Sequence, residues 1–364
     1  MFLAKHHYAI ELAKRGNRVY FLNPPEEKRA RKKKSVEVIP SGISDNLWLV
    51  KHELWFSQKI KFHAMPLFHA LMKSHVKKII KQISEPIDII WSFDLGNYYP
   101  FYFFGEKAYK IFHPVDEPLN ETAINAAKGC NIIFAVTREI LQKYSGFPVA
   151  GYFINHGVSE VFLVPVNVDK QAGNPVHVGF SGNLLRNDID RDILLHIISS
   201  NPEIVFEFFG SYTQYQSNIG GVEDDGVKCF ITTLQAQANV ILHGAIAQQM
   251  LVSAIHGMDA FLICYDIKKD QSRGTNYHKI MEFLSTGKVI ISNNVTTYEN
   301  DSDLLQMTKE RENNLQLPSL FKSVIYNLSH FNSSTFQQKR IAFASDNTYQ
   351  KQIDRIEVIL QNAQ

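Results

Sequence analysis

The sequence is poor in cysteine, in net charge and in long apolar runs. Its three cysteines, Cys130, Cys229 and Cys264, are far apart and lack metal-ligand spacing, which predicts reduced, packed thiols in a cytoplasmic protein. No apolar run approaches the length of a membrane-spanning helix, and we find no secretory signal pattern at its start. A formal net charge of +2 on 364 residues gives no indication of a nucleic-acid partner.

The length of the chain and its 45% hydrophobic content suit two α/β domains better than one. Apolar runs that read as strands alternate with helical patterns in both halves, at 87–92, 110–113 and 131–137, and at 176–181, 205–209, 240–242 and 260–265. Such alternation predicts parallel sheets covered by helices. With a polar linker at 165–175, we expect a first domain over 1–165, a second over 166–340, and a last helix over 341–364 that packs back on the first domain.

The clearest motif is the stretch 272–289, SRGTNYHKIMEFLSTGKV. Asn276 is expected to cap a short helix, and Gly287 is expected to end it before a buried strand. Arg273 and Lys279 flank the start of this helix, where cations oppose the helix dipole, and Glu282 follows one turn later. This placement predicts an external anion, so we infer a phosphate site with a carboxylate beside it. The alternative is an ordinary surface helix that carries a Lys/Glu pair.

This pattern, with Lys three residues before Glu-aromatic-Leu and then Gly-Lys and a β-run, resembles the donor site of GT-B-type glycosyltransferases. More narrowly, it is similar to the retaining, family-four-like enzymes that build bacterial surface polysaccharides. The resemblance implies that Lys279 meets the nucleotide diphosphate and that Glu282 binds the ribose hydroxyls. The family often carries an earlier glutamate eight residues before the second one, and this sequence has Gly274 there.

Further donor-site candidates follow other strands of the second domain. Gly182 and Asn183 come directly after a predicted strand, and glycine there lets backbone amides approach a diphosphate. The resembling enzymes often carry an Arg/Lys pair after this point, and Arg186 lies near it with a different spacing. By the same resemblance, Gly210, His243 and Gly244 fall where the family surrounds the nucleotide base. His243 could instead simply cap a strand.

Polar residues at the ends of strands in the first domain are candidates for the acceptor side. They are Asp94, His113, Asp116 and Glu117, and the carboxyl ends of parallel strands face the ligand crevice of an open sheet. Asp116 or Glu117 could act as a general base, or either could cap the helix that starts near Glu121. His113 loosely matches a histidine that related enzymes place against the donor sugar. We therefore predict His113, Asp116 and Glu117 as catalytic residues and expect no metal ligands.

Two basic features raise the question of a membrane. Residues 26–34, EEKRARKKK, form a charge run, most simply a solvated loop. The stretch 67–83 has an apolar helical stripe with Lys73, Lys77 and Lys81 on the opposite face. Such a helix can lie on anionic lipid, or it can pack its stripe on its own domain and leave the lysines in water. Both readings stay open.

The start of the chain departs from the family pattern. A predicted helix over 2–13 leads into a strand at 19–22, whereas in the resembling enzymes a first strand and a glycine-bearing loop come before that helix. We therefore expect the first sheet to lack that strand. The strands at 19–22 and 87–91 should then be unpaired or badly spaced along one edge.

Together these features predict an α/β protein of GT-B type, with two Rossmann-like domains that face each other across a cleft. The implied enzyme moves a sugar from a nucleotide sugar to a hydroxyl of a glycan or lipid-linked acceptor in surface polysaccharide biosynthesis. By the resemblance it is retaining and needs neither metal nor other cofactor beyond the donor. It would work in the cytoplasm, in peripheral contact with an anionic membrane at its inner face. The rivals are a nucleotide-sugar epimerase of the same fold and a non-catalytic nucleotide-sugar binder.

Overall fold

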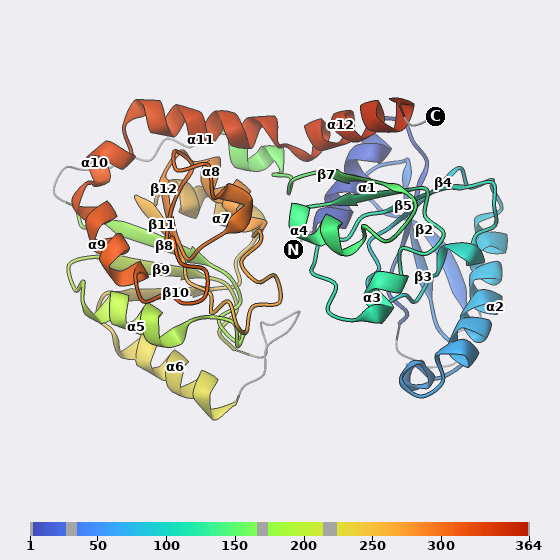
Figure 1. Cartoon of the computed structure of the whole chain (residues 1–364), viewed down its shortest axis with the longest axis horizontal. Helices are drawn as coiled ribbons and strands as arrows, with labels where there is room; N and C mark the ends of the chain where they lie inside the picture. Colours follow the sequence, from blue (N-terminus) through green and yellow to red (C-terminus); the bar gives the residue numbers. More distant parts are fainter. Residues whose placement is uncertain (1–2, 27–34, 166–173, 214–223, 363–364) are drawn as a thin grey trace. The chain divides into compact units, whose positions relative to one another are not determined.

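The computed structural model describes residues 3–26, 35–165, 174–213 and 224–362. They form two compact units, each with its own sheets and helices (Figure 1). One unit contains the chain up to Asn155 together with the chain from Tyr349 onward, and the other runs from His156 to Thr348. The charge run at 27–34 and most of the expected linker, 166–173, lie outside the described residues.

Main-chain hydrogen bonds show where the chain passes from one unit to the other. Ile154 still donates its N–H to Ala135 O in the first unit, whereas Val158 donates to Asn347 O and forms a bridge with Thr348. The changeovers therefore fall at 155/156 and 348/349, while the sequence placed them at 165/166 and 340/341. Polar, proline-bearing composition indicates a loop but does not indicate which sheet the neighbouring residues join.

The first unit holds two sheets, one of three strands in the order β1-β3-β2 and one of four parallel strands in the order β4-β5-β6-β7. In the smaller sheet β3 runs parallel to β1 and antiparallel to β2. The elements are α1 (Ala4–Lys14), β1 (Val19–Leu22), β2 (Val36–Pro40), β3 (Leu47–His52), η1 (Gln58–Phe62), α2 (Met65–Ile83), β4 (Ile89–Ser92), η2 (Phe101–Phe103), β5 (Tyr109–Phe112), α3 (Glu121–Asn125), β6 (Ile132–Ala135), α4 (Arg138–Lys143), β7 (Ala150–Phe153) and α12 (Tyr349–Asn362).

Strands β1 and β4 are each paired on one side only within the described part of the chain. All residues of β6, which has neighbours on both sides, are buried, whereas every residue of β1 is only partly buried and Ile89 of β4 is 51% exposed. Helix α1 contacts both sheets, because Ala9 packs with Leu47 and Tyr8 packs with Ile111. The predicted one-sided pairing of these two strands is confirmed.

Helix α12 closes the first unit by packing on α1. Arg15 donates to Asp354 Oδ1 at 2.6 Å and to Glu357 Oε2 at 2.9 Å. Ile353 is fully buried in a cluster that also contains Tyr8. The end of the chain is therefore part of the core that its beginning builds.

Helix α2 packs its apolar stripe on its own unit. Phe68, Met72 and Val76 are fully buried, and Lys77 and its neighbouring lysines on the helix are exposed. The apolar stripe therefore belongs to the core of the unit, while contact of the exposed lysines with anionic lipid stays a prediction. Within the described ranges, no helix is long and apolar enough to cross a membrane.

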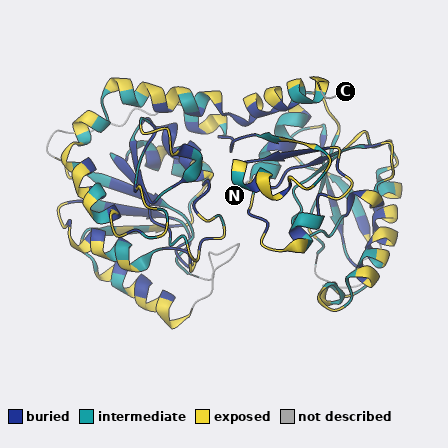
Figure 2. Ribbon diagram, viewed as in Figure 1, coloured by how far each residue is buried: buried dark blue, intermediate teal, exposed yellow. Residues whose placement is uncertain are grey.

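The second unit is built on a parallel sheet, as predicted, and its six strands have the order β10-β9-β8-β11-β12-β13. Its central strands β11 and β12 are completely buried, and the outer faces of the surrounding helices are exposed (Figure 2). The elements are η3 (Glu160–Leu163), β8 (His177–Ser181), α5 (Arg191–Ser199), β9 (Val205–Phe209), α6 (Asp225–Ala236), β10 (Val240–Gly244), α7 (Gln248–His256), β11 (Ala260–Ile263), α8 (Lys279–Leu284), β12 (Val289–Ser292), η5 (Thr296–Tyr298), β13 (Leu305–Met307), α9 (Leu317–Tyr326), α10 (Leu328–Phe331) and α11 (Ser334–Asp346).

The strand order of the second unit locates its ligand crevice. The chain winds outward from β8 to β10 and then returns to add β11 on the other side of β8. Connections on either side of this switch point leave in opposite directions, so a crevice forms at the carboxyl ends of β8 and β11. Of the cysteines, Cys130 and Cys264 are buried as predicted, but Cys229 on α6 is exposed and the expectation that it is packed is wrong.

Candidate functional site

Glycines at the ends of three neighbouring strands lie against one another at this crevice. Gly182 donates its N–H to Phe209 O, and Gly210 donates to Gly244 O, both at 2.9 Å. A Cβ on Gly210 would lie 1.9 Å from Gly182 O, and one on Gly182 would lie 2.8 Å from Lys279 Nζ. The close approach of the main chains therefore requires glycine at position 210, whereas a Cβ on Gly182 would meet the Lys279 ammonium group, which lies next to the end of β8.

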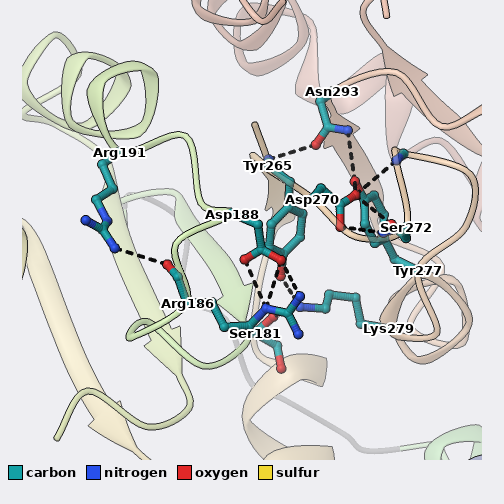
Figure 3. A network of polar contacts seen from close by, with 11 residues as sticks. Ser181, Arg186, Asp188, Arg191, Tyr265, Asp270, Ser272, Tyr277, Lys279 and Asn293 are labelled. Carbon is teal, nitrogen blue, oxygen red and sulfur yellow. Dashed lines mark hydrogen bonds and ion pairs between the residues drawn. The ribbon is translucent and has the colours of Figure 1, made fainter. Parts of the chain in front are cut away.

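Lys279 lies at the switch point itself. It is the first residue of α8, and the residue is only 8% exposed. Its Nζ donates to the carbonyl oxygen of Ser181, the last residue of β8, and to the hydroxyl of Tyr265 just beyond β11 at 2.5 Å (Figure 3). Both acceptors are neutral, so these bonds hold the ammonium group in place without cancelling its charge. A buried cation held in this way favours an anionic ligand.

Helix α8 begins later than the sequence suggested. Its N-cap is His278, so the prediction that Asn276 caps it is wrong. The first turn is closed by Ile280 N–H donating to Tyr277 O, which leaves Asn276, itself 5% exposed, in the preceding loop. Gly287 follows the helix with φ of +75°, as expected for a residue that ends it. The helix has only six residues, so the anion argument rests on Lys279 rather than on the helix dipole.

Asp270, which the sequence did not single out, organises the loop before α8. Its buried carboxylate accepts hydrogen bonds from Ser272 Oγ at 2.6 Å, from Tyr277 OH at 2.8 Å and from Gly274 N–H at 3.0 Å (Figure 3). Gly274 has φ of +65°, and a Cβ there would lie 2.6 Å from Ile267 Cδ1. The glutamate that the resembling family carries at this position does not fit this backbone. An aspartate two residues before a serine is a common turn signal, and this pattern is the feature of the sequence that indicates the role of Asp270.

Arg186 carries a second positive charge near the end of β8, and it is paired with the Asp188 carboxylate (Figure 3). Its Nε lies 2.9 Å from each carboxylate oxygen of Asp188, and its Nη2 also donates to that carboxylate. This hydrogen bonding raises the pKa of Arg186 further above its usual value, so the guanidinium stays charged. Asn183 accepts from Leu185 N–H at 3.0 Å through its side chain and shapes the turn between β8 and Arg186.

Glu282 follows Lys279 by one turn and is partly buried. Burial raises its pKa to about 7, against the lowering effect of the Lys279 charge. The carboxyl group therefore changes its protonation near neutral pH, and a ligand that donates hydrogen bonds to it would favour the ionised form.

The remaining predicted donor residues have other contacts. Arg273 is exposed with φ of +51°, and its carbonyl accepts from Arg311 Nη2 at 2.7 Å. His243 stacks on Phe209 with ring centroids 4.6 Å apart, and its Nε2 lies 2.6 Å from Glu207 Oε2. The structure thus brings Gly182, Gly210, Gly244 and Lys279 together with Arg186 beside them, and ties His243 to a carboxylate on the sheet.

Solved structures share this architecture over most of their length. Sucrose-phosphate synthase from Thermosynechococcus elongatus is similar with a TM-score of 0.68 and 11% identity, covering 98% of this chain and 92% of that one. An E. coli trehalose-6-phosphate protein bound to UDP-2-fluoro glucose gives 0.66 and 8%, covering 98% and 95%. HepE from Anabaena, in complex with UDP and glucose, gives 0.59 and 14%, covering 86% of each chain.

This chain has the GT-B fold. The predicted fold class, with two Rossmann-like units, is therefore confirmed, while the arrangement of the units about a cleft stays a prediction. No family model matches the sequence, and no curated protein matches it. At 8–14% identity the likeness to the solved structures shows the fold alone, so the chemistry has to be argued from this chain's own residues.

In the first unit of this GT-B protein, His113 directly follows β5 and is fully buried. Its ring contacts those of Tyr8, Trp91 and Phe93 at centroid distances of 5.2, 5.9 and 5.1 Å. Burial lowers its pKa to about 3, so the ring is neutral at physiological pH. Neither ring nitrogen has a hydrogen-bond partner among the residues that the structure describes.

The acidic candidates of this unit differ in exposure. Asp116 is exposed, whereas Glu117 is buried and its Oε1 pairs with the ammonium group of Lys143. Helix α3 is capped by Asn120, whose Oδ1 accepts from Ala123 N–H at 3.0 Å, so neither acid caps it and that alternative is wrong.

The Asp94 carboxylate stabilises the turn that follows β4. Its Oδ2 accepts from the N–H groups of Tyr98 at 2.6 Å and Tyr99 at 3.2 Å. Burial raises the pKa of Asp94, and these two hydrogen bonds work against that shift. Within the described ranges, no group of three or more His, Cys, Asp or Glu side chains is placed to hold a metal ion.

Proposed function

We propose that this GT-B protein is a glycosyltransferase that moves a sugar from a nucleotide sugar to a hydroxyl group of a glycan or lipid-linked acceptor in surface polysaccharide biosynthesis. The observation that supports it is the buried Lys279 ammonium group, held by Ser181 and Tyr265 at the switch point of the second sheet. Two structures of the same fold were solved with UDP-2-fluoro glucose and with UDP and glucose, which supports a nucleotide sugar as the donor.

The roles of the residues follow from where charge develops. During transfer the bond between the anomeric carbon and the diphosphate oxygen breaks, the acceptor oxygen bonds to that carbon, and the acceptor hydroxyl gives its proton to the departing diphosphate. Negative charge grows on the leaving diphosphate, next to which we place Lys279 with Arg186 beside it. Because Lys279 is already fixed by two hydrogen bonds, stabilising this charge requires little rearrangement. Glu282 would accept hydrogen bonds from the ribose hydroxyls and so fix the nucleoside.

We also propose that transfer is retaining and needs no divalent metal, with Lys279 and Arg186 supplying the positive charge at the leaving group. Retention through attack on the same face needs no strong base, which suits a Glu117 that is buried and paired with Lys143. Asp116 and His113 remain our candidates on the acceptor side. Activity that vanishes with a chelator and returns with added magnesium would rule out the metal-independent form of the proposal.

The test of function is a turnover assay on the full chain with a panel of nucleotide sugars and soluble glycan acceptors. Transfer predicts that free nucleoside diphosphate appears only when an acceptor is present. A new nucleotide sugar formed without any acceptor would instead identify an epimerase. A thermal shift with nucleotide sugar but no turnover across the acceptor panel would favour a non-catalytic binder.

We place the enzyme in the cytoplasm, in peripheral contact with the inner face of an anionic membrane that would carry the lipid-linked acceptor. The exposed lysines of α2 support this location. Fractionation of cells that express the intact protein tests it, since the protein should leave the membrane fraction on washing with salt.

A further inference from the structure

A long segment of the first unit carries no acidic residue. It runs from residue 54 to residue 84, between Glu53 and Glu85. In the structure it forms η1 and α2, which pack against each other. It contains the lysines Lys59, Lys61, Lys73, Lys77, Lys78 and Lys81, of which the four on α2 are all exposed. The outer surface of α2 is therefore positive, with no carboxylate from its own segment to neutralise it.

Two exposed aromatic side chains, Tyr102 and Trp55, lie beside these lysines, and Phe62 and Leu67 of the same segment are also exposed. The exposed fractions are 77% for Phe62, 56% for Tyr102, 53% for Leu67 and 51% for Trp55. Lys73 Nζ lies 5.6 Å from the ring centre of Tyr102, and Lys78 Nζ lies 5.9 Å from that of Trp55. Five residues along a helix turn the side-chain direction by about 140°, so the two aromatic rings lie on opposite sides of the lysines.

These exposed side chains are separate from the apolar stripe of α2. The centre of that stripe, Phe68, Met72 and Val76, is completely buried against the unit's own core. Leu67 and the lysines project from the remaining surface of the helix, whose outer side is drawn as exposed in Figure 2. The result is a surface on which charge and apolar rings alternate, which solvation alone does not explain.

We propose that this surface docks on an anionic lipid bilayer. We call it the lysine–aromatic face and define it as Trp55, Phe62, Leu67 and Tyr102 with Lys73, Lys77, Lys78 and Lys81. The lysines lie over lipid phosphates, and the rings with Leu67 enter the headgroup layer, where amphipathic aromatic side chains are favoured. Charge complementarity with the lysines, together with the exposed rings and Leu67 of this surface, favours the bilayer over a partner that contacts the lysines alone.

This inference refines the peripheral location proposed above but needs neither donor nor acceptor, so it can be tested without turnover. The probe is a set of unilamellar vesicles, either of neutral phosphatidylcholine or with about one third phosphatidylglycerol, mixed with the intact chain and separated by flotation. Each lysine near an anionic surface contributes about 1 kcal/mol, or about fivefold in binding. Lys77→Gln with Lys81→Gln should therefore weaken binding about 25-fold, and about 1 M salt should abolish it.

Two further variants sharpen the assignment. Lys128→Gln with Lys322→Gln removes the same charge from exposed positions outside the segment and should bind as the wild type does. Phe62→Ala should weaken binding about tenfold, because a phenyl ring no longer enters the lipid. Since Phe62 is 77% exposed, this change should leave the melting temperature and any nucleotide-induced shift unchanged.

The outcomes separate cleanly. Binding to anionic but not neutral vesicles, weakened by the α2 lysine variant and by Phe62→Ala, supports the lysine–aromatic face. No binding to anionic vesicles at low salt overturns it, as does equal weakening in the control pair. Loss with the lysines but none with Phe62→Ala would show that the vesicles are bound through charge alone, and the proposed entry of the rings into the headgroup layer would be overturned. None of these results depends on whether the protein transfers a sugar.

Discussion

Replacing Lys279 with methionine tests the anion site most directly. Methionine keeps most of the buried stem but removes the ammonium group that Ser181 O and Tyr265 OH hold. A charged hydrogen bond to a phosphate contributes about 1.5–3 kcal/mol, which corresponds to a 10- to 150-fold loss of nucleoside diphosphate affinity. In the empty protein the substitution has two opposing effects. It removes these two hydrogen bonds, and it also removes the free-energy cost of burying a charge whose acceptors are neutral. We therefore expect the empty protein to be as stable as the wild type or more stable.

The assay is thermal unfolding with and without nucleoside diphosphate. At a ligand concentration of about 100 Kd the wild-type protein gains about 2.7 kcal/mol, and a 30-fold weaker variant gains only about 0.9 kcal/mol. For a domain of this size 1 kcal/mol corresponds to about 2–4 °C, so the shift should fall from about 5–11 °C to about 2–4 °C. Lys322→Met, at an exposed position, should keep the full shift.

The reasoning fails if Lys279→Met lowers the melting temperature of the empty protein and still shows the full ligand-induced shift. Lys279 would then be a structural residue that fastens α8 to β8 and Tyr265. The phosphate site would have to lie elsewhere on the second unit, and the proposed stabilisation of the leaving group would lose its basis.

Three further variants test other residues of the two units. Glu282→Gln should weaken nucleotide binding by about 1–3 kcal/mol by calorimetry. Because burial raises the pKa of Glu282 to about 7, the wild-type fold should lose stability as pH rises from about 4.5 to 7, and the variant should lack that part of the slope. Gly210→Ala should destabilise the second unit by about 1–3 kcal/mol and abolish the nucleotide shift, because its Cβ would overlap Gly182 O, whereas Gly146→Ala, with nothing within 4 Å, should do neither. His113→Phe should make the protein more resistant to acid between about pH 6.5 and pH 3. In that range the histidine of the unfolded chain takes up a proton while the buried ring, with a pKa of about 3, stays neutral, so the wild-type fold loses stability. Equal acid midpoints for both proteins would refute this.

The parts of the fold that the sequence predicts are those where a local pattern decides the structure. Val19–Leu22 is a short apolar run between polar residues, and the structure makes it a strand with those bounds. Helix α6 is not apparent from the sequence, because β-branched Ile231 and Thr233 favour a strand. In the structure the packing of its buried Phe230 outweighs that preference. Strand β13 has three residues, and only its pairing with β12 distinguishes it from a loop.

The candidate site shows the same limit. Lys279 was recognisable because its neighbours form a pattern along the chain. Its acceptors lie at the end of β8 (Ser181) and just beyond β11 (Tyr265), so they become apparent only in the folded sheet. The role of Asp270 likewise depends on the left-handed turn at Gly274, which its carboxylate helps to fix. For Glu117, the sequence showed an acid at a strand end but not the distant Lys143 that pairs with it.

The return of α12 to α1 has a consequence for how the protein is made. The first unit is interrupted in sequence by the whole second unit, and its core lacks Tyr349, Ile353 and Ile356 until the last helix leaves the ribosome. At about 5–20 residues per second, the intervening stretch of roughly 200 residues takes about 10–40 s to synthesise. During that time the nascent first unit exposes the face of α1 that Tyr8 helps to form, while the second unit, contiguous in sequence, can fold. A chaperone that binds the nascent chain would therefore bind this face of α1. A premature stop after Thr348 would destabilise the first unit and leave the second unit complete.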